Sequence, residues 1–314
     1  MASIDLRPVS NSGLKVAPLA LGGNVFGWTA DETTSFRILD AFVDAGGTMI
    51  DTADVYSAWV DVHKGGESEE VIGRWLKRDP SKRDKVVIAT KVGFMAGLKP
   101  DTIGPACDAS LQRLGVETID IYYQHKDDES VPLPDSLKTF DDQAKAGKIR
   151  AIGLSNFTPG RLAEACIVAR VDGFPAVSAF QTWYNLLERP KYEAALREVA
   201  AKENLAVFPF YALANGYLTG KYRSRDDLGK SVRGLRNVEY LEGKGPRVLA
   251  ALDDVAAETG AALASVALAW TMAQPTITAP IASATSVEQA EELIAGMSLE
   301  LTPGQLERLT AASV

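Results

Sequence analysis

The sequence contains few of the residues used for disulfides and metal sites. Its 314 residues include only two cysteines, Cys107 and Cys166, and two histidines, His63 and His125. Each cysteine lies in an amphipathic helical pattern outside any Cys-x-x-Cys pair. This excludes a disulfide framework and a cysteine metal knuckle, and predicts that both thiols are buried apolar filler. Without a His-x-His pair we expect no metal site, and without evident paired carboxylates a hydrolase or isomerase is disfavoured.

Long hydrophobic runs and an excess of positive charge are also missing. The longest apolar candidate, Ala261 to Ala273, is shorter than the roughly 18 residues that a membrane helix needs. The net charge is −8 and the isoelectric point about 5.0, which disfavours nucleic acid and anionic membranes as partners. Residues 1–8 carry Asp5 and Arg7 and no apolar signal-peptide core, so we expect a cytoplasmic protein.

Two common nucleotide-binding motifs are absent as well. No Gly-x-Gly-x-x-Gly follows the first expected strand, because the glycines of segment 22–27 have a different spacing, and no Walker A motif occurs. The composition is 46% hydrophobic and 24% charged, which is enough for a sizeable core. No linker rich in Pro, Gly or Ser interrupts the chain, so residues 1–314 are expected to form one domain.

Hydrophobic patterning predicts a hairpin followed by eight strand–helix units. The hairpin joins 6–9 to 14–16, with Gly13 supplying the positive φ of the turn. The expected strands are Leu19–Leu21, Thr48–Ile50, Val86–Thr90, Ile119–Gln124, Lys148–Leu154, Val177–Gln181, Leu205–Phe210 and Thr276–Ile281. The expected helices are Thr34–Asp44, Ser68–Lys77, Thr102–Leu114, Pro134–Ala146, Pro159–Ala169, Pro190–Lys202, Pro246–Glu258, Leu263–Met272, Val287–Ala295 and Pro303–Ala311.

This alternation favours one α/β architecture over the other. Eight units of roughly 30 to 40 residues predict a (β/α)8 TIM barrel rather than an open doubly wound sheet. The hairpin would then cap the bottom of the barrel, and the last helix would be an extra C-terminal element.

Three consecutive strands each end on an ionisable residue: Asp51, Lys91 and His125. Tyr56 follows Asp51 in the next loop. Taken singly, these residues could be a loop cap, a surface charge, a loop histidine and a packing aromatic. Because the carboxyl ends of barrel strands meet at one mouth, and buried charges are costly unless paired, we interpret them together as a proton-transfer site.

Such a site suits the reduction of a carbonyl group. Hydride addition leaves negative charge on the carbonyl oxygen, so a proton donor must lie beside it. A free tyrosine has a pKa of about 10, and we expect the Lys91 ammonium to lower the pKa of Tyr56. Asp51 would keep Lys91 charged, while His125 would orient the carbonyl oxygen or relay the proton.

Several motifs, taken in order, resemble those of the aldo-keto reductases. They are Asp51-x-Ala53-x-x-Tyr56, Thr90-Lys91-Val92-Gly93, His125, Gly153-Leu154-Ser155-Asn156-Phe157, Gln181-x-x-Tyr184-Asn185, Gly216-x-Leu218-Thr219-Gly220-Lys221-Tyr222 and Pro280-Ile281-Ala282-Ser283-Ala284-Thr285-Ser286-x-Glu288-Gln289. The resemblance spans nearly the whole chain. It implies an (α/β)8 barrel that reduces carbonyl compounds with NADPH, with Asp51, Tyr56, Lys91 and His125 as the catalytic tetrad and Tyr56 as the general acid.

The same resemblance implies a set of cofactor-binding residues. Asp51, Ser155, Asn156 and Gln181 would surround the nicotinamide, and Phe210 would stack on its ring. Gly23 and Asn24, in the turn after the first strand, would also line the cofactor. The positions that would lie over the pyrophosphate are Tyr211, Leu213, Gly216 and Lys221, and those around the adenosine phosphate are Ser283, Thr285, Gln289 and Glu292. The alternatives are ordinary loop chemistry for Ser155 and Asn156, and core packing for Phe210.

Two departures bear on which cofactor is used. Thr285 stands where many relatives have arginine, which removes a bidentate phosphate partner, and Leu293 stands where many have asparagine. The basic segment from Lys221 to Arg236 is either a solvated surface loop or a clamp for the cofactor phosphates. Some relatives, the potassium-channel β subunits among them, carry a small hydroxyl residue at the position of Thr285 and still resemble NADP binders. We expect NADP(H), with NAD(H) as the other candidate.

The expected ligand of the mouth is a small-molecule carbonyl compound. Trp28, Trp59 and Phe94 follow the first three expected strands, where aromatic side chains commonly wall an apolar pocket. The alternative function is a cofactor-binding regulatory subunit of the same fold with little turnover, as the potassium-channel β subunits are. The complete tetrad favours the enzyme.

Overall fold

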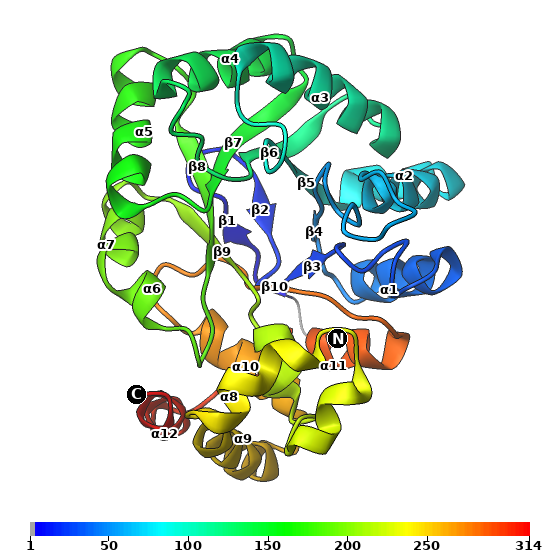
Figure 1. The fold of residues 1–314 in the computed structure, drawn as a ribbon, viewed down its shortest axis with the longest axis vertical. Helices are drawn as coiled ribbons and strands as arrows, with labels where there is room; N and C mark the ends of the chain where they lie inside the picture. The colour runs from blue at the N-terminus through cyan, green and yellow to red at the C-terminus, as the bar shows by residue number, and fades with distance from the viewer. Residues whose placement is uncertain (1–3) are drawn as a thin grey trace.

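The eight-stranded parallel barrel is confirmed. The computed structural model describes residues 4–314, and its main sheet has the strand order β10-β3-β4-β5-β6-β7-β8-β9 (Figure 1). A bridge between Val207 and Ile277, and a hydrogen bond from the Thr278 amide to the Val207 carbonyl (2.9 Å), join its two edges. The strands are β3 Ala20–Gly22, β4 Met49–Asp51, β5 Val87–Val92, β6 Ile119–Gln124, β7 Ile149–Ser155, β8 Val177–Trp183, β9 Ala206–Phe210 and β10 Ile281–Ala282.

Helices surround the sheet on its outer side (Figure 1). They are α1 Glu32–Asp44, α2 Glu67–Arg78, α3 Pro100–Leu114, α4 Leu133–Lys145, α5 Pro159–Val171, α6 Pro190–Glu193, α7 Ala195–Lys202, α8 Val238–Glu242, α9 Gly245–Thr259, α10 Leu263–Met272, α11 Val287–Ala295 and α12 Pro303–Ala312. No single helix within 4–314 is long and apolar enough to cross a membrane; α9 and α10 reach that composition only as a pair bent by 97°.

The N-terminal hairpin closes one end of the barrel, as predicted. Its strands are β1 Arg7–Pro8 and β2 Lys15–Val16, and Gly13 in the turn has φ +80°. Hairpin side chains, Val16 among them, form one buried cluster with residues of the barrel strands such as Tyr123 and Phe208. The Arg7 guanidinium also donates to the carbonyls of Met272, Ile277 and Thr278 (3.1–3.3 Å).

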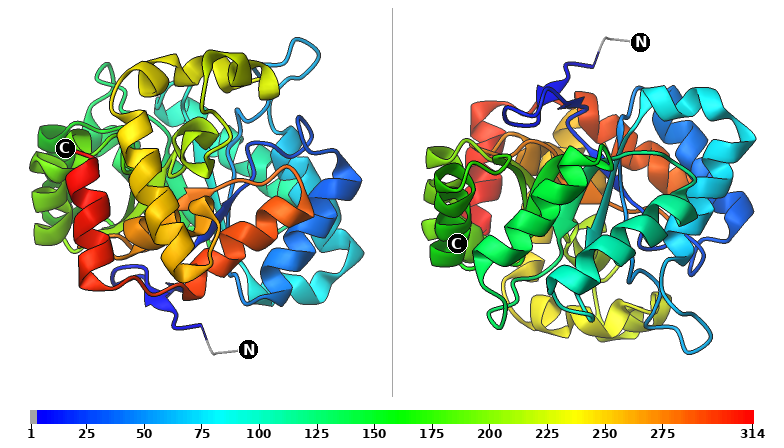
Figure 2. Two further views of the ribbon diagram at one scale, coloured as in Figure 1. Left: turned by 90° about the horizontal axis from the view of Figure 1, so that it is seen from below. Right: turned by 90° about the horizontal axis from the view of Figure 1, so that it is seen from above.

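The opposite end of the barrel carries long loops. Figure 2 shows the segment between β9 and α9, with the short helices η3 Arg225–Lys230, η4 Gly234–Asn237 and α8, at the end away from the hairpin. The loop between β4 and α2 projects at this same end in both views. We call this end the mouth.

Two of the predicted elements are shortened or broken in the structure. The last strand is not Thr276–Ile281 but the two-residue β10, because Pro280 has no N–H for a strand ladder and Thr276 has a left-handed φ of +70°. The expected helix Pro190–Lys202 is broken into α6 and α7 at Ala194, whose ψ of −112° is not helical.

Candidate active site

The alternation of barrel strands explains why polar side chains gather at the mouth. Met49, Ala89 and Tyr123 are buried in the interior cluster, one on each of three neighbouring strands. Because side chains two residues apart share a face of a strand, Asp51, Lys91 and His125 extend the same inward face by one step. All three side chains therefore lie together at the mouth of the barrel.

Lys91 is the centre of the hydrogen-bond network there. Its ammonium donates to Asp51 Oδ2 (2.7 Å), to the Thr52 carbonyl (2.7 Å) and to the Tyr56 hydroxyl (2.9 Å). Gln181 Nε2 donates to the other oxygen of Asp51 (2.6 Å). With three acceptors around Nζ, the buried charge is paired and hydrogen-bonded, as its burial demands.

The electrostatics of Tyr56 correct one expectation. Burial and the negative charge of Asp51 raise the pKa of Tyr56 well above its ordinary value, whereas we expected Lys91 to lower it. Burial also lowers the pKa of Lys91. Burial is the largest cause of the shift, and the charge of Asp51 acts in the same direction. Tyr56 therefore keeps its proton at neutral pH, which suits a donor.

His125 lies beside this network as a neutral imidazole. Its ring centroid is 6.1 Å from that of Tyr56 and 4.8 Å from that of Phe94. Burial, and then the charge of Lys91, lower the pKa of His125 well below its usual range. Its Nδ1 is buried with no hydrogen-bond partner among residues 4–314, so Nε2 is the nitrogen open to the mouth.

A second buried charge cluster, which sequence reasoning missed, lies behind Lys91. Glu69 is fully buried and accepts hydrogen bonds from Thr90 Oγ1 (2.6 Å) and Arg113 Nε (2.7 Å). Asp54 Oδ1 is also buried, without a partner in the described part of the chain. Burial and the charge of Glu69 raise the pKa of Asp54 to about 7. The only sequence signal was the acidic start of α2, which looked like ordinary helix-dipole chemistry.

This cluster predicts a pH-dependent effect of Asp54→Asn on stability. Between pH 3.8 and about 7, Asp54 is protonated in the folded protein but ionised in the unfolded chain. The carboxyl group therefore lowers the free energy of unfolding increasingly as pH rises through that window. We expect the variant to exceed wild type by about 2 to 4 kcal/mol at pH 8, with the difference vanishing near pH 4. Urea unfolding at several pH values measures this, with the exposed Asp61→Asn as control. An equal difference at all pH values would contradict it.

The predicted nicotinamide residues lie next to the tetrad. Ser155 and Gln181 are buried at the ends of β7 and β8, and Gln181 holds Asp51 as described above. Asn156 has a left-handed φ of +57° and donates from Nδ2 to the His125 carbonyl (2.9 Å) and to Ser155 Oγ (3.1 Å). Gln181 and Asn156 therefore hydrogen-bond to two members of the tetrad, and Ser155 is linked to His125 through Asn156.

The loop after β9 has an unusual backbone. Tyr211, Ala214 and Asn215 have φ values of +53°, +48° and +55°, and Gly216 has +86°. A left-handed conformation costs a non-glycine residue energy, and runs of this kind can form anion-binding concavities. Phe210 and Tyr211 form an aromatic group with Trp183, at centroid distances of 6.4 and 4.9 Å. Leu213 lies within this loop, and its carbonyl accepts from the Gly216 amide (2.9 Å).

The remaining predicted cofactor residues form two further groups. Asn24 Oδ1 accepts from Ser283 Oγ (2.6 Å), and the Gly23 amide donates to the Asp51 carbonyl (2.7 Å). At the start of α11, Thr285 donates through its hydroxyl and amide to Gln289 Oε1 (3.1 and 3.0 Å), and Glu292 is exposed on the same helix. Leu293, by contrast, is buried in the hydrophobic core, which accounts for an apolar residue at that position.

The basic segment Lys221–Arg236 divides into paired and unpaired cations. Arg223 binds both oxygens of Asp253 (2.7 Å each), Lys230 pairs with Asp227, and Arg225 pairs with Glu242. Within residues 4–314, Lys221, Arg233 and Arg236 have no carboxylate partner. Arg233 lies over the Trp28 ring (5.3 Å), and its charge acts on Tyr56. The segment is therefore neither wholly solvated nor wholly available as a clamp.

The three predicted substrate aromatics adjoin the tetrad. Trp28 and Trp59 meet edge to face at 5.3 Å, and Trp59 lies 6.1 Å from Tyr56. Phe94 packs on His125. Aromatic rings thus flank both the phenol and the imidazole.

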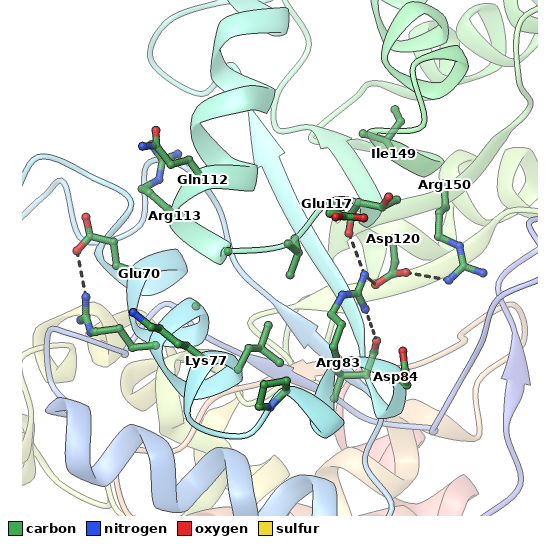
Figure 3. Close-up of a pocket in the computed structure, with 18 of the residues that line it drawn as sticks. Glu70, Lys77, Arg83, Asp84, Gln112, Arg113, Glu117, Asp120, Ile149 and Arg150 are labelled. Atoms are coloured by element: carbon green, nitrogen blue, oxygen red, sulfur yellow. Dashed lines mark hydrogen bonds and ion pairs between the residues drawn. The ribbon is translucent and has the colours of Figure 1, made fainter.

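A large groove on the outer wall is a different feature. It has a volume of about 1630 Å³ between α2 and α3 and is lined by charged side chains (Figure 3). Its buried carboxylate, Asp120, is already paired with Arg83 (2.9 Å) and Arg150 (3.0 Å). The groove follows the outer wall from the β4–α2 loop to a structural ion-pair network at the amino end of β6.

A parallel barrel with a tyrosine, a lysine, a histidine and an aspartate at its mouth is typical of barrel enzymes. Comparisons with known proteins identify the family. A profile of the "Aldo/keto reductase family" matches residues 18–314. The chain is 33% identical to the uncharacterized oxidoreductase YrpG of Bacillus subtilis, covering 93% of this chain and 91% of that protein. It is 29% identical to protein tas (96% of each) and to L-glyceraldehyde 3-phosphate reductase (94% and 88%), both of Escherichia coli. The protein belongs to the aldo/keto reductase family and is an oxidoreductase.

Proposed function

We propose that the protein reduces aldehydes or ketones to alcohols with NADP(H), and that Tyr56 is the general acid. The observation that carries this proposal is the network in which the Lys91 ammonium, held by buried Asp51, donates to the Tyr56 hydroxyl. A phenol fixed in this way beside a neutral imidazole can protonate an oxygen that gains negative charge.

The residues of the site have separate roles at the carbonyl carbon and at the carbonyl oxygen. The nicotinamide, when bound, supplies the hydride that the carbonyl carbon accepts. His125 Nε2 and the Tyr56 hydroxyl hold the substrate oxygen, and Tyr56 gives it a proton. Lys91 stabilises the phenolate that remains, at the 2.9 Å separation observed. Gln181 and Lys91 keep Asp51 in place, so the network is preorganised before substrate binds.

The chain's own residues fit a dinucleotide. The left-handed run 214–216 lies near Lys221, since a Cβ added to Gly216 would lie 3.0 Å from Lys221 Nζ. Asn215 Oδ1 in this run is buried without a partner among residues 4–314. A bound pyrophosphate would neutralise Lys221 and Arg233, which otherwise have no carboxylate partner in the described chain. The 2′-phosphate of NADP(H) would lie at the N-terminus of α11, beside Thr285 and Gln289.

Arg233→Met tests the cofactor assignment. Losing a charge-assisted phosphate contact should weaken NADPH binding on the order of 10- to 100-fold. The matched control is Arg225→Met, because Arg225 is exposed and already paired with Glu242. We expect the control to bind NADPH as wild type does.

Fluorescence titration of the purified protein with NADPH and with NADH measures both effects. Tighter binding of NADPH supports the 2′-phosphate site at α11. Equal or tighter binding of NADH would overturn the NADP(H) assignment and keep the reductase. If Arg233→Met and Arg225→Met changed the NADPH affinity equally, Arg233 would not be a residue of the cofactor site.

A further inference from the structure

One carboxylate beside the catalytic network has no partner. Among the buried polar atoms that lack a hydrogen bond within residues 4–314, Asp54 Oδ1 is the only carboxylate oxygen. A buried polar group without a partner carries the full cost of losing its water. Such a group in a native structure calls for an explanation, and its position next to a catalytic lysine points to a functional one.

Backbone hydrogen bonds fix Asp54 alongside Lys91. The Thr52 amide donates to the Ala89 carbonyl (2.8 Å), and the Asp54 amide donates to the Lys91 carbonyl (3.1 Å). The pairing of β4 with β5 thus continues beyond the last residue of β4. The far end of the same loop closes over this segment, because a Cβ added to Gly65 would lie 2.8 Å from the Asp54 carbonyl oxygen. The main chain therefore sets the position of Asp54 relative to Lys91, whatever side chain residue 54 carries.

The guanidinium of Arg113 does not pair with Asp54, because Glu69 binds it. Arg113 Nε and Nη2 each lie 2.7 Å from Glu69 Oε2, and Thr90 Oγ1 donates to Glu69 Oε1 (2.6 Å). Both oxygens of Glu69 are thus hydrogen-bonded, and its charge is balanced. Asp54 forms no ion pair in the described part of the chain, so its negative charge remains available to other groups.

Lys91 is the buried cation on which this charge acts. Burial lowers the pKa of Lys91, and neighbouring carboxylates oppose that shift. The charged and titratable groups that face Lys91 are Asp51 and Tyr56 from the end of β4 and its loop, Asp54 from the same loop, Glu69 from α2 and His125 after β6. Those that face Asp54 are Glu69 from α2, Arg113 from α3, Lys91 from β5 and Tyr122 from β6. A negative charge near an ammonium favours its protonated form, so ionised Asp54 stabilises charged Lys91.

We propose that Asp54 is a positioning residue for carbonyl reduction: its carboxylate, held behind Lys91 without a partner of its own, keeps the Lys91 ammonium charged as the pH rises. This role rests on the proposed function, because charged Lys91 stabilises the phenolate of Tyr56. Asp51 pairs with Lys91 directly and fixes where the ammonium lies, whereas Asp54 extends the pH range over which it stays protonated. The lower stability at alkaline pH and the wider pH range of catalysis are thus two effects of the same unpaired charge.

The pH profile of kcat separates this role from a structural one. In Asp54→Asn the midpoint of the alkaline limb should fall by about half a pH unit or more, while the affinity for NADPH stays that of wild type. The variant should also be more stable than wild type at pH 8, so its lost activity cannot come from unfolding. Asp61→Asn, which removes an exposed carboxylate from the same loop, is the matched control and should keep the wild-type profile. An alkaline limb at the wild-type pH in Asp54→Asn would overturn the proposal.

A second measurement reads Lys91 without turnover. In protein labelled with ¹³C-lysine, the Cε resonance of Lys91, assigned by its absence from Lys91→Arg, is titrated without cofactor or carbonyl compound. Its midpoint should fall by about half a pH unit or more in Asp54→Asn and stay unchanged in Asp61→Asn. An unchanged Lys91 midpoint in Asp54→Asn would overturn the role of Asp54, even if the kcat profile moved. A lowered midpoint in a protein that reduces no carbonyl compound would support the action of Asp54 on Lys91 and contradict the proposed function.

Discussion

Tyr56→Phe is expected to lower kcat by roughly 10²- to 10⁴-fold, the range that a positioned general acid supplies. The affinity for NADPH should stay close to that of wild type, because the phenol acts on the reacting oxygen in the transition state. Lys91 keeps two of its three acceptors in the variant, Asp51 and the Thr52 carbonyl, so the charge pair survives. Steady-state NADPH oxidation and fluorescence titration measure the two effects.

Tyr184→Phe is the matched control for Tyr56→Phe. Tyr184 is buried and, like Tyr56, donates one hydrogen bond, here to Glu193 (2.7 Å), in a part of the fold that α6 covers. The control should cost about 1 kcal/mol of stability and leave kcat unchanged. If Tyr56→Phe lost binding and rate equally, or kept its rate, Tyr56 would not be the general acid.

Lys91→Met should affect both stability and catalysis. Removing the ammonium leaves Asp51 as a buried charge held only by Gln181 and the hydroxyl of Tyr56, which costs about 3 to 5 kcal/mol. Turnover should fall at least about 100-fold, since nothing then stabilises the phenolate. Urea unfolding and NADPH oxidation measure the two losses.

The double variant Lys91→Met with Asp51→Asn separates these losses. Replacing the orphaned carboxylate with a neutral amide should recover most of the stability and none of the activity. Near-normal turnover in either variant at neutral pH would show that the pair does not support Tyr56. Recovery of activity together with stability would reduce Lys91 to a structural role.

The sequence predicts the barrel and the position of the tetrad because side chains alternate regularly along each strand, from the interior of the barrel to the mouth. The inward face that carries Met49, Ala89 and Tyr123 continues to Asp51, Lys91 and His125, and both the apolar runs and their polar ends are visible in the sequence. Turn chemistry likewise identifies Gly13, whose positive φ the structure confirms.

What the sequence did not predict depends on contacts between distant segments. The direction of the Tyr56 pKa shift depends on a balance between burial, Asp51 and Lys91, which no motif contains. The fully buried position of Glu69 depends on Arg113 from α3, and the unpaired state of Arg233 depends on which of its neighbours found carboxylates. The short β10 results from Pro280 and the left-handed Thr276 inside an otherwise strand-like run.

The most direct test of the central proposal is NADPH consumption by the wild-type protein with a panel of aldehydes and ketones, with the alcohol product measured alongside. We expect one alcohol formed for each NADPH oxidised, and no consumption without the carbonyl compound. Tight binding of NADPH without turnover on any carbonyl would contradict it, and would leave the site a cofactor-binding regulatory one.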